Sequence, residues 1–167
     1  MKTLLLLRHA KSSLNDPTFS DNMRPLSYQG KHDVHIIIKF LKNKKLIPNM
    51  IISSTAKRAV QTANLIAEYI DYHNEIHLSD LLYQTTTKDY INVISKIPNK
   101  NNNIVLLVGH NPILENLLEI ITNELRIMKM CSLAHIVLSV NSWIEIKTQT
   151  KGKLIELIDV SSFYSNM

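Results

Sequence analysis

The sequence predicts an α/β fold, a three-layer sandwich in which helices flank a mostly parallel central sheet. Short continuous apolar runs recur along the chain, and such runs are typical of strands that are buried on both faces. Segments with the three- and four-residue spacing of amphipathic helices separate these runs. The last third carries closely spaced strand-like segments, which predicts antiparallel pairing near the C-terminus.

The composition is that of one folded domain covering residues 1–167. Hydrophobic residues make up 45% and charged residues 20% of the 167 positions, which permits a sizeable core and excludes wholesale disorder. The net charge of +5 favours acidic partners but does not separate a phosphate from a nucleic acid or a membrane surface. The densest basic stretch, 39–45, closes a predicted helix, where cations face the negative end of the helix dipole.

Several features favour a cytoplasmic protein without membrane contact. The apolar run Leu4–Leu7 is shorter than the roughly 7–15 residues of a signal-peptide core. No stretch approaches the roughly 18 apolar residues of a membrane span. The single cysteine, Cys131, excludes an intramolecular disulfide and a CxxC metal or redox motif.

The first half is expected to alternate strand, loop, helix, strand and helix. The strands are Leu4–Leu7 and Met50–Ile52, and turn-forming residues predict a loop over 15–25. Ser27 can cap the first helix. The apolar positions that define the two helices are Val34, Ile37, Ile38 and Leu41, then Ala59, Ala63, Ile66, Ala67 and Ile70.

The second half continues the alternation and then turns to strands alone. Residues 75–83 alternate weakly and predict a short strand, and a helix over 87–97 is ended by Pro98. After a strand at 104–108, Asn111 is expected to cap a helix with Pro112 in its first position. The final strands are expected at 133–140, 143–147 and 153–160.

Polar side chains follow each of the three apolar strands. Arg8 and His9 follow the first, Ser53, Ser54 and then Arg58 follow the second, and Gly109, His110 and Asn111 follow the third. In an open α/β sheet, ligands bind beyond the carboxyl ends of the strands. The sequence therefore predicts that two arginines and two histidines meet at one edge of the sheet.

These residue types suit a tetrahedral anion such as phosphate. Arginine matches phosphate oxygens with a planar fork of N–H donors, and the helix starts near 54–55 and 111–112 add positive dipole ends. We expect Gly109 to provide a tight turn before His110. No aspartate cluster, His-x-x-x-His pair or Walker-type loop is present, so we expect neither a metal nor another cofactor. His9 would act as a nucleophile, kept neutral by the nearby arginines, with His110 as a donor to the phosphoryl group.

At this point the sequence resembles the histidine phosphatase superfamily, most closely its short SixA-type phosphohistidine phosphatase branch. The matching pieces occur in family order: LLLLRHAKSS at 4–13, D-x-x-RPL-x-x-x-G at 21–30, SSTAKRAVQTA at 53–63 and VGHNP at 108–112. The resemblance implies that His9 is the phosphorylated residue. It also implies that Arg8, Arg58 and His110 complete the phosphate pocket.

Other residues near these pieces each have a functional and a structural interpretation. Arg24 either supports the pocket or forms a loop ion pair with Asp21, and Lys11 and Ser12 either contact phosphate or order their loop. Around Cys131–Ser132 the match to the small family turn is poor, so a contribution of Ser132 to the site is in doubt. The remaining five histidines are assigned to surface or structural roles.

The expected substrate follows from the proton demand of the reaction. Asp80 is the best-placed proton donor, or else a solvated loop residue, and the absence of a long insertion predicts an open, shallow site. An imidazole leaving group needs a weaker proton donor than the alkoxide leaving group of an ester. This difference favours phosphohistidine on a partner protein as the substrate. The alternatives are a broader phosphomonoesterase and a non-catalytic phosphate-binding module. A nucleic-acid binder lacks an aromatic platform or a motif.

Overall fold

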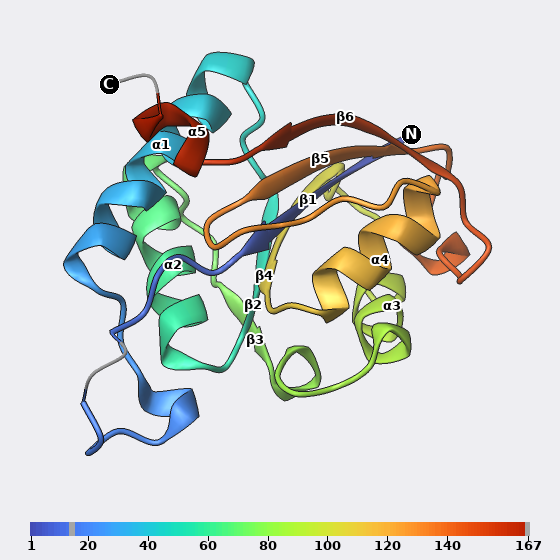
Figure 1. Ribbon diagram of the computed structural model, residues 1–167. Helices are drawn as coiled ribbons and strands as arrows, with labels where there is room; N and C mark the ends of the chain where they lie inside the picture. Colours follow the sequence, from blue (N-terminus) through green and yellow to red (C-terminus); the bar gives the residue numbers. More distant parts are fainter. Residues whose placement is uncertain (14–15, 166–167) are drawn as a thin grey trace.

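The computed structural model describes residues 1–13 and 16–165 and confirms the three-layer α/β sandwich (Figure 1). Its six-stranded sheet has the order β3-β2-β4-β1-β5-β6. Neighbouring strands among the first four run parallel: β1 (Lys2–Arg8), β2 (Met50–Ser54), β3 (His77–Ser79) and β4 (Ile104–Gly109). The last two, β5 (Leu133–Leu138) and β6 (Gly152–Ile158), add the predicted antiparallel edge beside β1.

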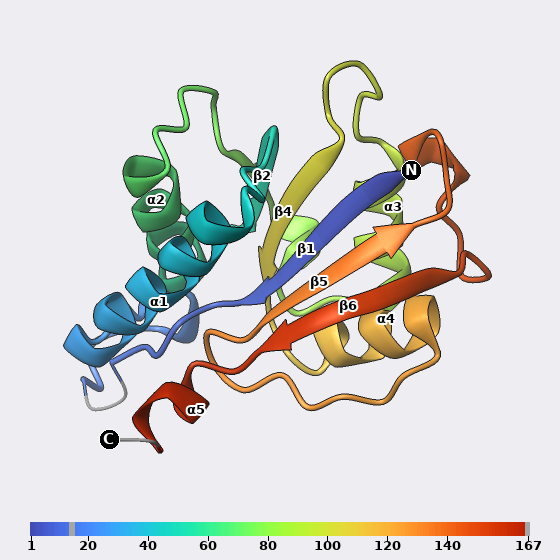
Figure 2. The same ribbon diagram turned by 90° about the horizontal axis from the view of Figure 1, so that it is seen from above.

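Two pairs of helices cover the two faces of the sheet (Figure 2). On one face lie α1 (Tyr28–Lys44) and α2 (Lys57–Tyr69), and on the other lie α3 (Thr87–Ser95) and α4 (Ile113–Thr122). Leu5 and Leu7 of β1 pack into the first core, and Leu4 and Leu6 pack into the second. The continuous apolar run arises because alternate side chains of this central strand enter different cores.

One predicted strand is wrong. Residues 143–145 form a short 3-10 helix, η3 (Trp143–Glu145), instead of a strand over 143–147. Ser142 and Glu145 form a reciprocal capping box, which closes a helical turn at this point. Trp143 and Ile146 are buried while Ile144 is exposed, so the burial follows helical spacing and not the alternation of a strand.

Several boundaries differ from the prediction. The weak strand at 75–83 shortens to β3 and continues as the 3-10 turn η2 (Asp80–Leu82). The described part of the loop predicted over 15–25 holds a similar turn, η1 (Asp21–Met23), whereas residue 15 lies outside the described residues. A short helix, α5 (Ser161–Tyr164), follows β6. None of the described helices is long and apolar enough to cross a membrane.

The predicted cap at Asn111 is also wrong. Pro112 is the N-cap residue of α4, and the Asn111 side chain makes no capping bond. Its amide instead donates to the Glu115 carboxylate and the Met128 carbonyl. Asn111 therefore ties α4 to the segment that leads into β5, which is a role that local sequence spacing does not reveal.

Candidate active site

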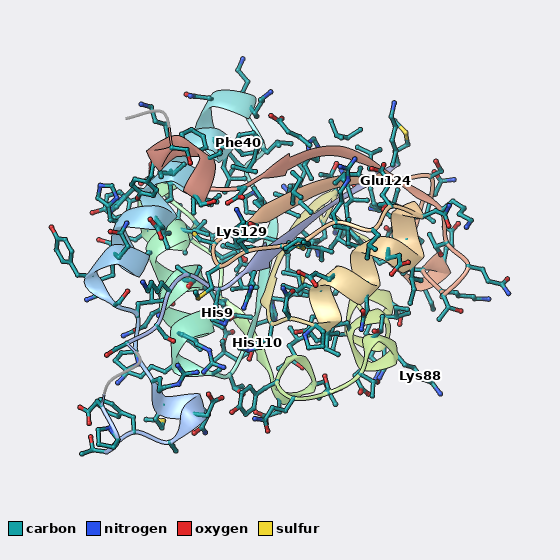
Figure 3. The ribbon with its side chains drawn as sticks, in the orientation of Figure 1. His9, Phe40, Lys88, His110, Glu124 and Lys129 are labelled. Carbon is teal, nitrogen blue, oxygen red and sulfur yellow. The ribbon has the colours of Figure 1, made fainter. Side chains whose placement is uncertain are left out.

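Three parallel strands deliver their following residues to one edge of the sheet. Arg8 is the last residue of β1 and lies beside Gly109 of β4, so that His9 and His110 emerge next to each other (Figure 3). Arg58 reaches the same place from the first turn of α2. These four side chains line a pocket of about 540 Å³, together with Ser12 and Arg24.

The imidazole of His9 is buried and oriented by two hydrogen bonds. Its Nδ1 lies 2.8 Å from the carbonyl oxygen of Ala10, a contact that requires the ring proton on Nδ1. Nε2 is then unprotonated and accepts a bond from Arg58 Nε at 3.2 Å. Burial, and next the charges of Arg58, Arg8 and Arg24, lower the pKa of His9 to about 4 despite the bond to Ala10. The ring is therefore neutral at pH 7.

Arg58 and Arg24 share one carboxylate. Arg58 donates from Nη2 to Asp21 Oδ2 at 3.2 Å and from Nη1 to the Asp21 carbonyl at 2.7 Å. Arg24 donates from Nη2 to Asp21 Oδ1 at 2.6 Å and from Nη1 to Ser12 Oγ at 3.0 Å. Arg24 thus both lines the pocket and forms the ion pair with Asp21. A hydrogen bond from Tyr83, and then the two arginines, hold the pKa of Asp21 well below its usual range.

Arg8 is held from the opposite side by α4 and the segment before β5. Its Nη1 donates to the Met128 carbonyl at 3.0 Å. Glu115 Oε1 fixes that carbonyl because it accepts from the backbone N–H of Met128 at 2.8 Å and from the Asn111 amide at 2.7 Å. Arg8 Nε is buried and has no hydrogen-bond partner among the described residues. Burial lowers the pKa of Arg8, and the negative charge of Glu115 acts in the opposite direction. An arginine remains charged at pH 7.

His110 closes the pocket beside His9. Its Nε2 lies 2.7 Å from Ser54 Oγ, and its ring centroid lies 5.0 Å from that of His9. Its ring also packs edge-on against the ring of Tyr83, with 5.6 Å between the two ring centroids. Burial, followed by His9 and Arg58, lowers the pKa of His110 to about 3, so this ring is also neutral at pH 7.

The two glycines beside the site are required for space. A Cβ at Gly109 would lie 2.4 Å from the hydroxyl of Tyr90, which accepts a bond from the N–H of His110 and donates to Leu82. A Cβ at Gly30 would lie 2.1 Å from the carbonyl oxygen of Lys11. None of the described glycines has a positive φ, so close packing, and not a left-handed backbone conformation, requires a glycine at position 109.

Two of the predicted site residues do not line the pocket. The Lys11 side chain is exposed, and the residue contributes its carbonyl, which accepts from the N–H and hydroxyl of Ser27. Asp80 accepts from Thr55 Oγ1 at 2.7 Å and is absent from the lining. Ser132 is buried, with no partner for its hydroxyl among the described residues.

Sequence reasoning missed Tyr83, Gln61 and Thr62, and it considered Asp21 only as the partner of Arg24 in a loop ion pair. Asp21 and Tyr83 both line the pocket, and Tyr83 donates to Asp21 Oδ2 at 2.7 Å. Gln61 and Thr62 of α2 accept from the N–H groups of Leu26 and Ala10, which anchors both loops. Asp21, Gln61 and Thr62 stand inside the quoted motif pieces, whereas nothing in the local pattern marks Tyr83. Within residues 1–13 and 16–165, no cluster of three His, Cys, Asp or Glu residues could hold a metal ion.

Comparisons with known proteins agree with this architecture. The family model of the histidine phosphatase superfamily (branch 1) matches residues 4–87. An uncharacterized chloroplastic protein of Arabidopsis thaliana is 29% identical over 152 residues, covering 86% of this chain and 70% of that protein.

Solved structures extend the similarity to nearly the whole chain. The protein histidine phosphatase SixA in complex with tungstate superposes with a TM-score of 0.81 at 18% identity, covering 96% of this chain and 99% of that one. A candidate phosphohistidine phosphatase SixA from Agrobacterium tumefaciens superposes with a TM-score of 0.79 at 25% identity, covering 95% and 97%. The chain is therefore a phosphatase of the SixA type that belongs to branch 1 of the histidine phosphatase superfamily.

Proposed function

We propose that this protein removes phosphate from phosphohistidine on partner proteins through a covalent intermediate on His9. The observation that carries the proposal is the state of the His9 ring. Its Nδ1–H is engaged by Ala10, and its Nε2 lone pair faces Arg58 inside a pocket with three arginines. A neutral imidazole among fixed cations is both able to attack phosphorus and surrounded by groups that bind its oxygens.

In the first step, the Nε2 lone pair of His9 gives up the hydrogen bond from Arg58 Nε and forms a bond to phosphorus, while the bond from phosphorus to the substrate nitrogen breaks. The departing imidazole takes the bonding electrons and receives a proton from solvent. The hydrogen bond from Nδ1 to Ala10 strengthens as the ring becomes positive, which stabilises the phosphorylated form of His9. In the second step, water attacks phosphorus, the bond to Nε2 breaks, and inorganic phosphate leaves with neutral His9 restored.

Arg8, Arg24, Arg58 and His110 would bind the phosphoryl oxygens. The unpartnered Nε of Arg8 is a free donor in the described structure. Ser54 Oγ accepts from the N–H of Ala56, so its own proton is available to Nε2 of His110. That arrangement puts the ring proton of His110 on Nδ1, from which it can donate to a phosphoryl oxygen. The SixA structure is a complex with tungstate, a tetrahedral oxyanion, which supports oxyanion binding by a protein of this fold.

The acid–base groups of the pocket favour a phosphoramidate over a phosphate ester. Asp21 is the single carboxylate among the described lining residues, and its low pKa keeps it ionised and unable to supply a proton at pH 7. Burial raises the pKa of the Tyr83 hydroxyl, which also makes it a poor acid. An alkoxide leaving group needs a strong proton donor, whereas an imidazole can leave without one.

The test is a phosphoenzyme trap with His9→Ala and, as a matched control, the exposed His73→Ala. Wild type and both variants are mixed with a labelled phosphohistidine protein or an aryl phosphate, quenched in alkali and analysed by mass spectrometry. We expect acid-labile phosphate on His9 and release of phosphate from the phosphohistidine protein, both lost in His9→Ala and retained in His73→Ala.

Other results would contradict the proposal in distinct ways. Faster turnover of the aryl phosphate would identify a broader phosphomonoesterase. Phosphate binding without any phosphoenzyme or turnover would identify a phosphate-binding module.

A further inference from the structure

We infer that Asp21 is an internal anion that competes with the phosphoryl group for the arginine donors of the pocket and thereby weakens the hold of the pocket on phosphate. The inference rests on the proposed function, because it places the phosphoryl group among the same arginines. It concerns a separate property, which is the affinity of the pocket for its product.

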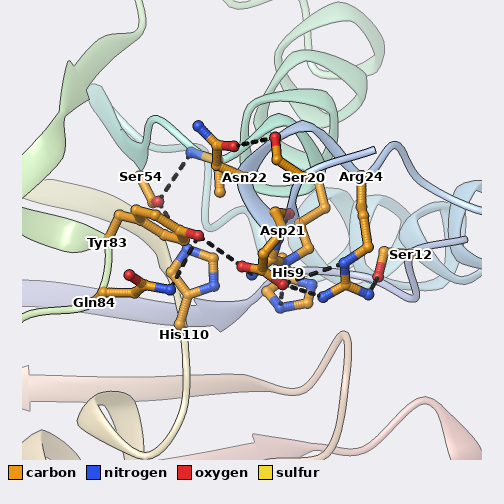
Figure 4. A network of polar contacts seen from close by, with 12 residues as sticks. His9, Ser12, Ser20, Asp21, Asn22, Arg24, Ser54, Tyr83, Gln84 and His110 are labelled. Carbon is orange, nitrogen blue, oxygen red and sulfur yellow. Dashed lines mark hydrogen bonds and ion pairs between the residues drawn. The ribbon is translucent and has the colours of Figure 1, made fainter. Parts of the chain in front are cut away.

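The contacts of the Asp21 carboxylate resemble those that a bound phosphate would receive. Oδ1 accepts from Nε and Nη2 of Arg24 at 3.2 and 2.6 Å, and Oδ2 accepts from Arg58 at 3.2 Å. Tyr83 donates the fourth bond to the carboxylate, to Oδ2 at 2.7 Å from the opposite wall of the pocket, and Gln84 donates to the tyrosine hydroxyl at 3.1 Å. Figure 4 shows the carboxylate lying between Tyr83 and Arg24, beside His9.

The carboxylate accepts one hydrogen bond from Arg58 and two from Arg24. Arg58 gives Nε to His9, Nη1 to the Asp21 carbonyl and Nη2 to the Asp21 carboxylate. Arg24 gives its Nε and Nη2 edge to the same carboxylate. Because a guanidinium presents its N–H groups in a fixed plane, a phosphoryl group can receive these bonds only if the carboxylate gives them up.

The position of Asp21 makes that exchange possible. Its side chain is 47% exposed, whereas that of Arg58 is 7% exposed. A carboxylate that moves away from the arginines therefore enters water and regains its hydration, without the large penalty of a buried unpaired charge. The arginine stays in the pocket while the carboxylate leaves, so the exchange does not dismantle the site.

The charge balance gives the exchange a functional consequence. Three arginines and one carboxylate line the pocket, and both histidines are neutral at pH 7, which leaves two net positive charges. Two positive charges match a phosphate dianion, and a pocket without Asp21 would carry a third. The returning carboxylate competes with inorganic phosphate after each turnover and so assists its release.

Asp21→Asn tests this inference, because asparagine keeps the shape and one acceptor oxygen but removes the charge. Inorganic phosphate is titrated into the full-length wild type and variant at pH 7, and the dissociation constant is measured by calorimetry. We expect phosphate to bind about tenfold more tightly to Asp21→Asn, which corresponds to about 1.4 kcal/mol. Tyr83→Phe removes one bond to the carboxylate without changing a charge, and we expect a smaller change in the same direction.

The direction of the change decides the outcome. Weaker or unchanged phosphate binding in Asp21→Asn, in a variant with a wild-type circular dichroism spectrum, would overturn the inference, because Asp21 would then position the arginines instead of competing for them. If Asp21→Asn does not fold, a lack of tightening in Tyr83→Phe overturns it equally. A folded wild type that binds no phosphate would refute the phosphate pocket itself, which separates failure of the proposed function from failure of this inference.

Discussion

The two ends of β1 carry two cationic side chains that differ in how far the fold satisfies their hydrogen bonds. Lys2, at the start of the strand, is only 4% exposed and directs Nζ to three oxygens, those of Asn99, Asn102 and the Asn103 side chain. Arg8, at the end, bonds to the Met128 carbonyl and leaves Nε buried without a partner among the described residues. An ammonium has three protons, so Lys2 is satisfied by the fold, whereas Arg8 retains a donor for a ligand.

The hollows around these two ends differ in the same way. They have similar volumes, about 500 Å³ near Met50 at the amino ends of the strands and about 540 Å³ at the site. Asn49, which lines the first, uses its side-chain oxygen to accept from the N–H groups of Asn103 and Ile104. The site instead gathers three arginines and two neutral histidines. Cavity volume therefore does not distinguish the two hollows. Hydrogen-bond donors without a partner and shifted pKa values do distinguish them.

The largest expected effect comes from Arg8→Met, which removes the charged donor and keeps an unbranched side chain. We expect turnover of phosphohistidine to fall by about 10²–10³-fold, since one preorganised donor to the transition state is lost. The free energy of unfolding should change little, because the variant also removes a buried N–H that has no partner. Steady-state kinetics and urea denaturation of one preparation check both statements. A large loss of stability would show that the fold depends on Arg8 as it does on Lys2, which would contradict the difference between the two ends of β1.

Acid should destabilise the site end of the molecule through its histidines. Their folded pKa values lie below 6.5, so the unfolded chain binds more protons than the folded one, and stability falls as the pH drops from about 7 to 5. For His9, with a pKa of about 4, the loss at pH 5 is about 2 kcal/mol.

Denaturant unfolding at both pH values would measure this loss. We expect His9→Gln to lose about 2 kcal/mol less than wild type over the same interval. An identical pH dependence in the two proteins would show that His9 titrates normally.

Lys2→Met should have the complementary effect to Arg8→Met. Three oxygens lose their donor, and the Trp143 ring loses the ammonium that lies 5.9 Å from its centroid, so we expect stability to fall by about 1–3 kcal/mol. The folded fraction should keep its wild-type kcat, because the substitution lies at the far end of the strand. A fall in kcat at a temperature where the variant is fully folded would contradict this assignment.

The smallest effect is expected behind Arg8, at Glu115. Both of its hydrogen bonds, from Asn111 and from Met128, fall on Oε1, which a glutamine retains. We expect Glu115→Ala to lower kcat about tenfold because the Met128 carbonyl loses its anchor, and Glu115→Gln to restore most of it. Equal losses in the two variants would show that the charge of Glu115 matters to Arg8, and not the anchoring.

Sequence reasoning predicted the parts of the site that follow strands. Arg8, His9 and His110 were placed by the rule that parallel strands point their carboxyl ends to one edge, and Arg58 by the start of the next helix. The contact between Asp21 and Tyr83 was missed because it joins two turns that lie 62 positions apart in the sequence and whose packing has no local signature. The amide of Asn111 was assigned to a cap because its partner Met128 lies far along the chain.

The fold was predicted to a similar depth. The buried strands and amphipathic helices follow from hydrophobic spacing, which depends on neighbouring residues alone. The turn at Trp143 was mistaken for a strand because Trp143, Ile144 and Ile146 form a short apolar run in the sequence. Nothing in the sequence marks Lys2 as buried, since its burial depends on carbonyls near residue 100.

The strand order has a consequence for how the chain can be made. β4 lies between β1 and β2, so these two early strands do not touch, and β1 has no partner until residues 104–109 have been synthesised. The segment 4–87 that carries the family signature therefore holds a β1 whose two neighbours in the sheet, β4 and β5, lie outside it. Such distant pairings slow folding, and a growing chain would expose the leucines of β1 until β4 emerges. We therefore expect nascent chains that stop before β4 to depend on chaperones, and a fragment of residues 1–103 to aggregate instead of folding.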